Sequence, residues 1–450
     1  MPHRTLATEV SNPSHAPWDL ISSYIKFRSD DAQFWWDSTG RMFARLLEAA
    51  GYSHSDQYRE LFFYATWVIP GMGPAPDVNG KHTGAWSSVW APGGTPVEFS
   101  WDFGQAGDNP MVRFSWEPIG RDAGTPLDPL NSFAATEWFD RVKQQNLLPG
   151  LETAWYHHFV RHMLPPPDMR RVKTADSVIE ATTPVGGIGI AIDIEPSGRQ
   201  VSKPLLYPGL RALELGISNL EMVERAVRAL PAEQLAALNV DPLFDYLHEA
   251  TARWGMETGI VCIDCLKPEE SRIKIYVRAP HTSVDWLMDG ITLGGRYDPK
   301  AIYGEETVQD LADLWQAFLK DAPDAVPTDK APARASPGFY FTIGAGKKHA
   351  SPKMYLSPSH FVKNDQEVVD RLREFFATRR KPAKTETMDN YEAALKDIYG
   401  PLLKKPDYGT IFYVGAAMTK NGLRVVTYHD PQVVGSHGRA DLFGTKYGDE

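Results

Sequence analysis

The feature that most constrains the fold of this chain is a set of short segments in which polar and apolar side chains alternate. The clearest are VEFSWDF at 97–103, VRFSWE at 112–117 and RIKIYV at 272–277. A period of two indicates β-strands, because successive side chains of a strand point to opposite faces. One face of each segment is apolar, while the other carries charged groups such as Glu98 and Arg113. The strands therefore separate an apolar surface from a charged one.

The charged faces also combine cations with tyrosine. Lys274 and Tyr276 lie two residues apart, and Lys353 and Tyr355 repeat that spacing. Further tyrosines lie on two segments that a short KNG turn would join as a hairpin. A half-exposed antiparallel sheet also alternates, but its polar face usually mixes Thr, Ser, Glu and Lys. A repeated pairing of cations with tyrosine favours an enclosed polar face.

Segments with helical periodicity separate the strands. The expected helices are one ending at Gly51, one stopped by Pro70, and four at 218–230, 235–254, 305–320 and 365–379. Helices that cover the apolar strand faces leave the polar faces to line an interior, which a sheet closed on itself supplies. The sequence thus predicts a barrel with a lumen rich in Lys, Arg and Tyr.

Composition limits the classes of protein that fit. The 450 residues include 47 Lys and Arg against 57 Asp and Glu, a net charge of −10 that argues against nucleic acid or an anionic membrane as partner. No apolar run is long enough to span a bilayer, and two cysteines exclude a disulfide scaffold. The first residues are polar and lack the apolar core of a signal peptide, so a cytoplasmic protein is expected. We expect a disordered tail at 1–16, one domain at 17–450 and a loop at 322–337; a monomer and a homodimer both stay open.

Aromatic residues are abundant, with 13 Trp, 18 Tyr and 20 Phe. Most Trp and Phe residues are expected in the core, on outer barrel or helix faces. This group includes Trp35, Trp101, Trp116 and Trp315.

A lumen of this kind has a specific chemical use. Several Arg and Lys side chains that converge without paired carboxylates suit a highly charged anion such as a diphosphate. Tyrosine faces beside them stabilise a carbocation by roughly 0.5–2 kcal/mol per ring. Ionisation of an allylic diphosphate requires both an anion site and a shield for the cation.

Six motifs together resemble one known family, the dimethylallyltryptophan synthases, which are indole prenyltransferases of fungal secondary metabolism. The motifs are FWW at 34–36, PVEFS at 96–100, VRFSWEP at 112–118, DPLNSF at 128–133, SRIKIY at 271–276 and TLGG at 292–295. The resemblance implies an α/β fold, a barrel of ten antiparallel strands with a solvent-filled lumen and a surrounding ring of helices.

The resemblance also implies roles for individual residues. Glu98 matches the glutamate that accepts a hydrogen bond from the indole N–H. The diphosphate-binding cations match Arg113, Lys203, Arg272, Lys274, Lys353 and Lys420. The tyrosines that shield the cation match Tyr276, Tyr355, Tyr413 and Tyr428.

Three positions depart from the family pattern. Leu205 replaces one shield tyrosine, and Tyr207 is the candidate to substitute for it. Gly189 is nearest to the lysine base of relatives that prenylate C4 of tryptophan, so C4 of free tryptophan is not the expected target. Gly338 falls where relatives limit the length of the prenyl group, and glycine there leaves room for a C10 or longer donor.

The function implied is transfer of an allylic prenyl group to an indole of tryptophan or of a tryptophan-containing compound, such as a cyclic dipeptide or an indole alkaloid. The prenyl diphosphate is a co-substrate, and no cofactor or divalent metal is expected. Two alternatives stay open: transfer to tyrosine or another phenolic or non-indole aromatic, and a non-catalytic barrel that carries a hydrophobic ligand. The acceptor, the attacked atom, normal or reverse attachment and the group that removes the ring proton are not determined by the sequence.

Other motifs are interpreted as structural. They are Asp30-Asp31 as helix capping, Cys262 and Cys265 as buried thiols, His158 and His162 as a surface helix face, and the glycine-rich segments 186–189 and 344–348 as loops or strand ends.

Overall fold

Ten antiparallel strands form a closed barrel in the computed structural model, which describes residues 16–105, 108–166, 188–194, 198–319, 336–379, 385–406 and 409–434. Each strand pairs with its neighbour in sequence, and β1 and β10 close the barrel. The strands are β1 (Val97–Asp102), β2 (Met111–Trp116), β3 (Gly189–Ile194), β4 (Gln200–Leu206), β5 (Glu257–Ile263), β6 (Arg272–Arg278), β7 (Gly338–Gly344), β8 (Ser351–Leu356), β9 (Ile411–Thr419) and β10 (Gly422–His429). The expected ten-stranded barrel is confirmed.

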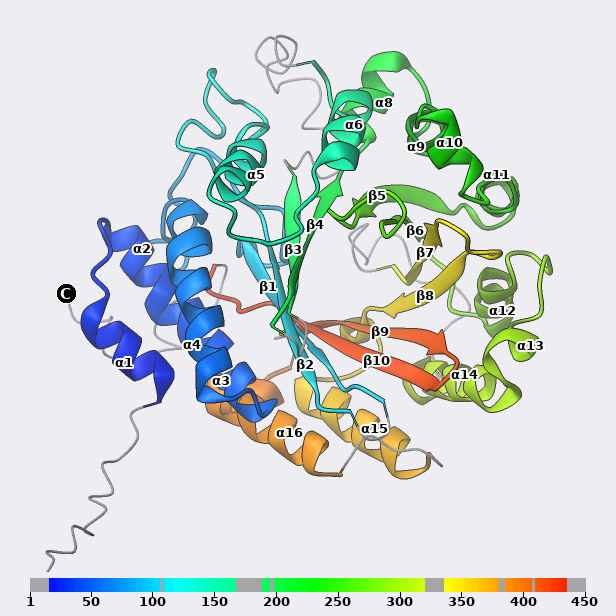
Figure 1. Cartoon of the computed structure of the whole chain (residues 1–450). Coiled ribbons are helices and arrows are strands. Elements are labelled where there is room, and N and C mark those ends of the chain that lie inside the picture. The colour runs from blue at the N-terminus through cyan, green and yellow to red at the C-terminus, as the bar shows by residue number, and fades with distance from the viewer. Residues whose placement is uncertain are drawn as a thin grey trace, which may run out of the picture.

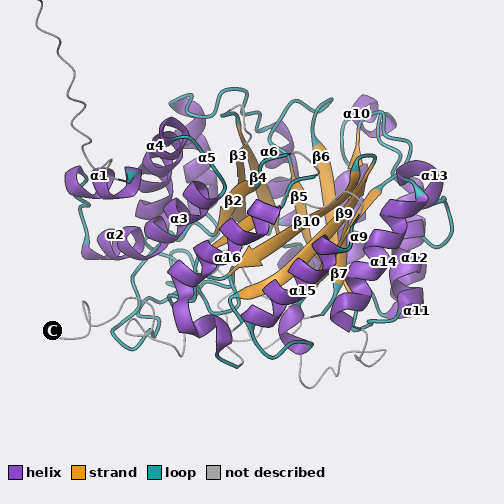
Figure 2. Ribbon diagram, turned by 90° about the horizontal axis from the view of Figure 1, so that it is seen from below, coloured by secondary structure: helices purple, strands orange, loops and turns teal. Residues whose placement is uncertain are grey.

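Helices surround the barrel (Figure 1), and a second view shows the strands enclosed among them (Figure 2). The helices are α1 (Pro17–Tyr24), α2 (Asp30–Trp35), α3 (Arg41–Ala49), α4 (His54–Phe63), α5 (Ala134–Gln144), α6 (Ala154–Met163), α8 (Gly209–Leu215), α9 (Asn219–Arg228), α10 (Ala232–Ala236), α11 (Asp241–Trp254), α12 (Val284–Thr292), α13 (Pro299–Tyr303), α14 (Glu305–Leu319), α15 (Asp365–Ala377) and α16 (Thr385–Tyr399). Helix α14 packs on β9 and β10, and α16 packs on α3. No helix within the described ranges combines the length and the apolar character needed to cross a bilayer.

The helix predictions hold in most places. Ser218 caps α9 by accepting a hydrogen bond from the Glu221 backbone N–H, as expected. The single helix expected at 235–254 is wrong, because α10 ends at Ala236 and α11 begins at Asp241 with a proline in its first turn. The expected tail, except for its last residue, and most of the loop at 322–337 lie outside the described residues.

The core lies between the barrel and the helices. Trp35, Trp101, Trp116 and Trp315 are all buried there, as expected. Phe43 of α3 stacks on Phe99 of β1 with ring centroids 5.6 Å apart, an arrangement that adds about 0.5–1.5 kcal/mol beyond the burial of area. Because the outward face of each strand is held in this core, the inward side chains keep fixed positions.

Candidate active site

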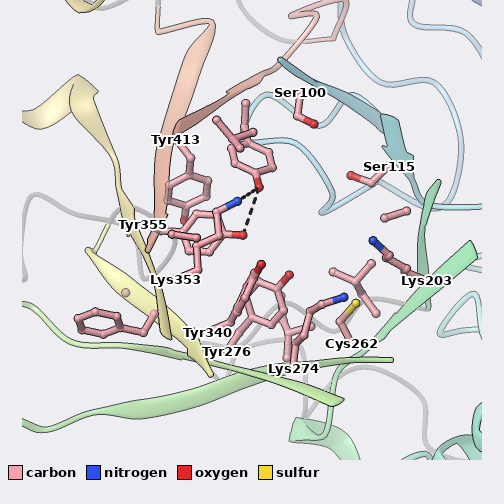
Figure 3. Close-up of a pocket in the computed structure, with 18 of the residues that line it drawn as sticks. Ser100, Ser115, Lys203, Cys262, Lys274, Tyr276, Tyr340, Lys353, Tyr355 and Tyr413 are labelled. Carbon is pink, nitrogen blue, oxygen red and sulfur yellow. Dashed lines mark hydrogen bonds between the residues drawn. The ribbon is translucent and has the colours of Figure 1, made fainter. Parts of the chain in front are cut away.

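The lumen holds one cavity of about 500 Å³, lined by side chains from all ten strands. Strand register places the chemically important groups next to one another. Tyr276 pairs with Tyr340, which in turn pairs with Lys353. Figure 3 shows that Lys353 and Tyr355 face the same space as Lys203 and Lys274. The alternation in the sequence thus produces the expected lumen of cations and tyrosines.

Aspartates hold the cations on one side of this cavity. The Asp102 carboxylate accepts hydrogen bonds from Arg113 (Nη2 to Oδ2, 2.7 Å) and from Arg424 (Nε to Oδ2, 2.6 Å). Asp193 forms an ion pair with Lys203, and its Oδ1 lies 3.3 Å from Nε of Arg113. Arg113 therefore bridges two carboxylates.

A third aspartate, Asp264, binds two cations of β6. Asp264 is fully buried and accepts hydrogen bonds from Nε of Arg272 at 2.5 Å and from Nζ of Lys274 at 2.6 Å. The expectation of cations without paired carboxylates is therefore wrong. The cations nevertheless outnumber the carboxylates, which are Glu98 and the three aspartates. Eight Arg and Lys residues line the cavity: Arg113, Lys203, Arg272, Lys274, Arg278, Lys347, Lys353 and Arg424. The cluster keeps a net positive charge that an anion can neutralise.

Titration of the cluster reflects burial and charge together. Burial alone would raise the pKa of Asp102, but the guanidinium groups of Arg113 and Arg424 lower it below its usual range. Burial would likewise raise the pKa of Asp264, and the surrounding cations lower it. Burial lowers the pKa of Lys203 well below its usual range, with a further contribution from Lys274. Burial, and then the charge of Arg113, does the same to the pKa of Lys353. An anion bound between these lysines would favour their charged forms.

Tyrosine rings form a continuous cluster beside the cations, on strands that also carry Lys274, Lys353 and Arg424. The ring centroid of Tyr355 lies 6.0 Å from that of Tyr276, 5.7 Å from that of Tyr413 and 5.6 Å from that of Tyr428. The four expected shield tyrosines are thus brought together. Tyr340 belongs to the same cluster, with its centroid 5.0 Å from that of Tyr276, and sequence reasoning missed it.

These rings surround the amino group of Lys353. The Lys353 ammonium lies 5.1 Å from the ring centroid of Tyr355, 5.2 Å from that of Tyr428 and 5.7 Å from that of Tyr340. Its Nζ also donates a hydrogen bond to the Tyr428 hydroxyl at 2.8 Å (Figure 3). Distances of this size permit cation–π attraction. The tyrosine cluster is therefore shaped to stabilise positive charge.

Glu98 lies on β1 at another part of the wall. Its carboxylate accepts a hydrogen bond from the Ser115 hydroxyl, which is its register partner on β2. The same hydroxyl accepts a hydrogen bond from the Trp90 indole N–H at 3.3 Å. This chain of two hydrogen bonds orients the carboxylate toward one edge of the cavity.

The remaining predicted residues divide between the cavity and the surface. Tyr207, Leu205 and Gly338 line the cavity. Lys420 does not, since it is exposed in the turn between β9 and β10. Arg424, four residues before Tyr428 on β10, lines the cavity instead and was missed.

The segment 84–96, called here the Trp90 loop, covers the edge of the cavity near Glu98. Glu117, just after β2, accepts hydrogen bonds from the Trp86 indole N–H at 2.8 Å and the Ser88 hydroxyl at 2.6 Å. At the other end of the loop, the Asp430 carboxylate accepts a hydrogen bond from the Gly93 backbone N–H at 2.7 Å. Two buried carboxylates thus fasten this loop to the barrel.

Asp430 makes the stability of the fold depend on pH. Burial raises its pKa to about 6 from an unfolded value of 3.8, so the folded state binds this proton more tightly between those values. Stability from this group is therefore present below about pH 4 and lost as the pH rises through 6, an effect of about 3 kcal/mol. We expect Asp430→Asn to remove this part of the pH dependence of the unfolding free energy, measured by urea denaturation from pH 4 to 7. An unchanged slope in the variant would contradict the assignment.

One of the structural interpretations is wrong, because Asp30 and Asp31 do not cap the helix that they begin. Ser29, and not Asp30, caps α2, while Asp31 accepts a hydrogen bond from the Ala75 backbone N–H at 2.8 Å. Cys262 and Cys265 are free and buried, as expected, and Cys262 also lines the cavity. Among the described residues, no three His, Cys, Asp or Glu side chains group in a way that would hold a metal ion.

Known proteins share sequence features and the fold of this chain. The model of the family described as tryptophan dimethylallyltransferase matches residues 31–393. The chain is 28% identical to the 4-O-dimethylallyl-L-tyrosine synthase of Claviceps purpurea, over 89% of this chain and 88% of that protein. It is also 28% identical to the 7-dimethylallyltryptophan synthase hasE of Aspergillus fumigatus, over 80% and 77%. The crystal structure of NotF in complex with brevianamide F and DMSPP superposes with a TM-score of 0.75 at 23% identity, over 93% of this chain and 100% of that one.

Proposed function

This chain belongs to the tryptophan dimethylallyltransferase family of aromatic prenyltransferases, and from that premise we propose that it transfers an allylic prenyl group from its diphosphate to an indole ring of tryptophan or of a small tryptophan-containing compound. The observation that carries the proposal is a cationic cluster beside a tyrosine cluster in one cavity that Glu98 also lines. These are the three parts that an electrophilic aromatic substitution needs.

Ionisation of the donor is the first step. The allylic C–O bond breaks, and its electron pair leaves with the diphosphate. Arg113, Lys203, Arg272, Lys274, Lys353 and Arg424 supply the stabilising charge. Cations fixed by strands and aspartates stabilise the leaving group without reorganising during the step. They thereby take the role that a divalent metal has in other enzymes, so no metal is required.

The allyl cation is then held against the tyrosine cluster. Tyr276, Tyr355, Tyr413 and Tyr428 offer their ring faces, with Tyr340 beside them and Tyr207 just after β4. The rings stabilise the cation and exclude water that would otherwise capture it.

Attack by the acceptor completes the reaction. Glu98 accepts a hydrogen bond from the indole N–H and so raises the electron density of the ring. A new C–C bond forms to the allyl cation, and loss of the ring proton restores aromaticity. Position 189, where some relatives carry a lysine, is glycine in this chain, so another group or water takes that proton.

A phenolic oxygen is the second candidate acceptor. A relative that matches 89% of this chain carries the name of a tyrosine 4-O-dimethylallyl synthase. O-prenylation removes a hydroxyl proton, which Glu98 can accept directly, and needs no base on the ring. This candidate therefore agrees with a glycine at 189.

One experiment separates the candidates. The protein is incubated with dimethylallyl or geranyl diphosphate and with tryptophan, tyrosine or tryptophan-containing cyclic dipeptides, with EDTA present. We expect a C-prenylated indole, identified by mass and NMR spectra. An O-prenylated tyrosine supports the second candidate. The absence of a product with every acceptor, or a strict need for added metal, would contradict the proposal.

Gly338 tests the donor side. A Cβ at this position would lie 2.4 Å from the Val277 carbonyl oxygen, so a substitution also strains β7. We expect Gly338→Met to reduce the rate with geranyl diphosphate more than the rate with dimethylallyl diphosphate. The ratio of the two rates within one variant is the measurement, because a loss of folded protein affects both equally. An unchanged ratio would remove Gly338 from the control of donor length.

A further inference from the structure

The Trp90 loop enters the cavity at a place where the barrel wall has no side chain. A Cβ built on Gly189 of β3 would lie 1.9 Å from Cζ3 and 2.1 Å from Cη2 of the Trp90 ring. No real Cβ approaches a ring so closely, so the indole occupies the volume that a side chain at 189 would fill. The ring is half-buried and lines the cavity.

Both ends of the Trp90 residue are fixed. Its backbone N–H donates to the Ser88 hydroxyl at 3.1 Å, and that hydroxyl donates to Glu117 at 2.6 Å. Its indole N–H donates to the Ser115 hydroxyl, which in turn donates to Glu98. Trp90 is therefore held by one carboxylate behind it and linked to the carboxylate at the cavity edge.

The motifs at 112–118 and 128–133 gain a function from this arrangement. Glu117 accepts four hydrogen bonds, from Trp86, Ser88, the Val89 backbone and Asn131. Neither Glu117 nor Asn131 lines the cavity. Their contacts instead hold the Trp90 loop against the barrel, which makes them positioning residues.

The size of the cavity indicates what faces Trp90. A pocket for one drug-sized ligand commonly measures about 300–1,000 Å³, whereas this cavity of about 500 Å³ must accommodate a donor and an acceptor together. The donor occupies the side with the cations and tyrosines. The acceptor is left with the edge between Glu98 and the Trp90 ring.

We propose that Trp90 is a specificity-determining residue that stacks on the aromatic ring of the acceptor and restricts this edge to a single aromatic amino acid in preference to a cyclic dipeptide. The proposal rests on the prenyl transfer proposed above. Gly189 contributes to the same specificity, because only glycine at position 189 leaves room for the Trp90 indole.

Acceptor kinetics test the proposal. We expect Trp90→Ala to raise the KM for the free amino acid by about 3- to 10-fold, the loss of one stacked ring pair. Its relative kcat/KM for a cyclic dipeptide should rise at least about 10-fold, while affinity for dimethylallyl thiolodiphosphate stays within about 2-fold. Trp90→Phe keeps a ring but loses the N–H, so it should retain the acceptor preference and lose part of kcat. Trp254→Ala, which removes another half-buried indole bonded to a carboxylate, is the control. An unchanged acceptor preference in a folded Trp90→Ala protein would overturn the proposal.

A second measurement does not depend on catalysis. Gly189→Ala should lower the melting temperature strongly in the wild-type background and far less in the Trp90→Ala background, because the added methyl group meets the indole only in the first. Equal losses in both backgrounds would overturn the pairing of Gly189 with Trp90. Binding of the acceptor by calorimetry, with and without Trp90, separates a failure of this proposal from a failure of the wild type to transfer a prenyl group.

Glu117 tests the positioning. Glu117→Gln replaces an acceptor of four hydrogen bonds by a group that also donates. We expect the acceptor KM to rise in the same direction as for Trp90→Ala, with the affinity for the thiolodiphosphate unchanged. A loss of kcat alone, without a change in acceptor KM, would contradict a positioning role.

Discussion

Glu98→Ala is expected to lower kcat for prenyl transfer at least about 100-fold, the lower range for a positioned catalytic group. The carboxylate is held by Ser115 at the edge of the cavity and is the group proposed to accept a hydrogen bond from the acceptor substrate. Without it, the arene is a weaker nucleophile, and the allyl cation returns to the diphosphate or meets water. Product formation at saturating donor and acceptor, followed by chromatography, gives the value.

Two variants make this result specific. Glu98→Gln keeps the shape and loses the charge, so it should resemble the alanine variant in rate while keeping its melting temperature. Glu257→Ala removes an exposed carboxylate from β5, outside the cavity lining, and should leave the rate unchanged. Near-native turnover in Glu98→Gln would remove the charge of Glu98 from the mechanism.

Arg113→Gln is expected to lower kcat by about 100- to 1,000-fold, the range for the loss of one fixed donor to a developing anion. Arg113 lies between Asp102 and Asp193 at the centre of the cation cluster. Its removal leaves each aspartate with another partner, Arg424 or Lys203. The variant should therefore fold and fail at ionisation.

Inhibition by inorganic diphosphate locates the defect. We expect its inhibition constant to rise at least about 10-fold in Arg113→Gln, since a charge-assisted hydrogen bond contributes about 1.5–3 kcal/mol. Affinity for the acceptor should not change. Arg296→Gln, which alters an arginine that pairs with Glu249 outside the cavity, is the matched control. An unchanged inhibition constant would place Arg113 outside the diphosphate site.

Much of the site was predictable wherever a strand alternates clearly. Lys274 and Tyr276 face the lumen because Ile273 and Ile275 define the opposite face. Tyr340 was missed because Phe339 and Phe341 flank it, so β7 is aromatic on both faces. Arg424 and Tyr428 are four residues apart on one strand and therefore share a face. This spacing could have identified Arg424, in place of Lys420, as the cation of the cavity.

Contacts set by tertiary structure were not predictable. The pairing of Asp264 with Arg272 and Lys274 depends on how the chain turns between β5 and β6. Trp90 lies in a loop without periodicity, and only the fold brings it over Gly189. Such contacts leave no pattern along the chain.

The pairing of β1 with β10 determines when a nascent chain becomes an enzyme. Asp102 and Arg424, which join across this seam, are 322 residues apart in sequence. Until the last strand emerges from the ribosome, β1 lacks one of its two partners and presents an unpaired edge, which invites association with other chains. Closing so large a loop is also entropically slow. Synthesis conditions that slow aggregation should therefore raise the yield of active protein, and a chain that stops before β10 should accumulate as an open, inactive sheet.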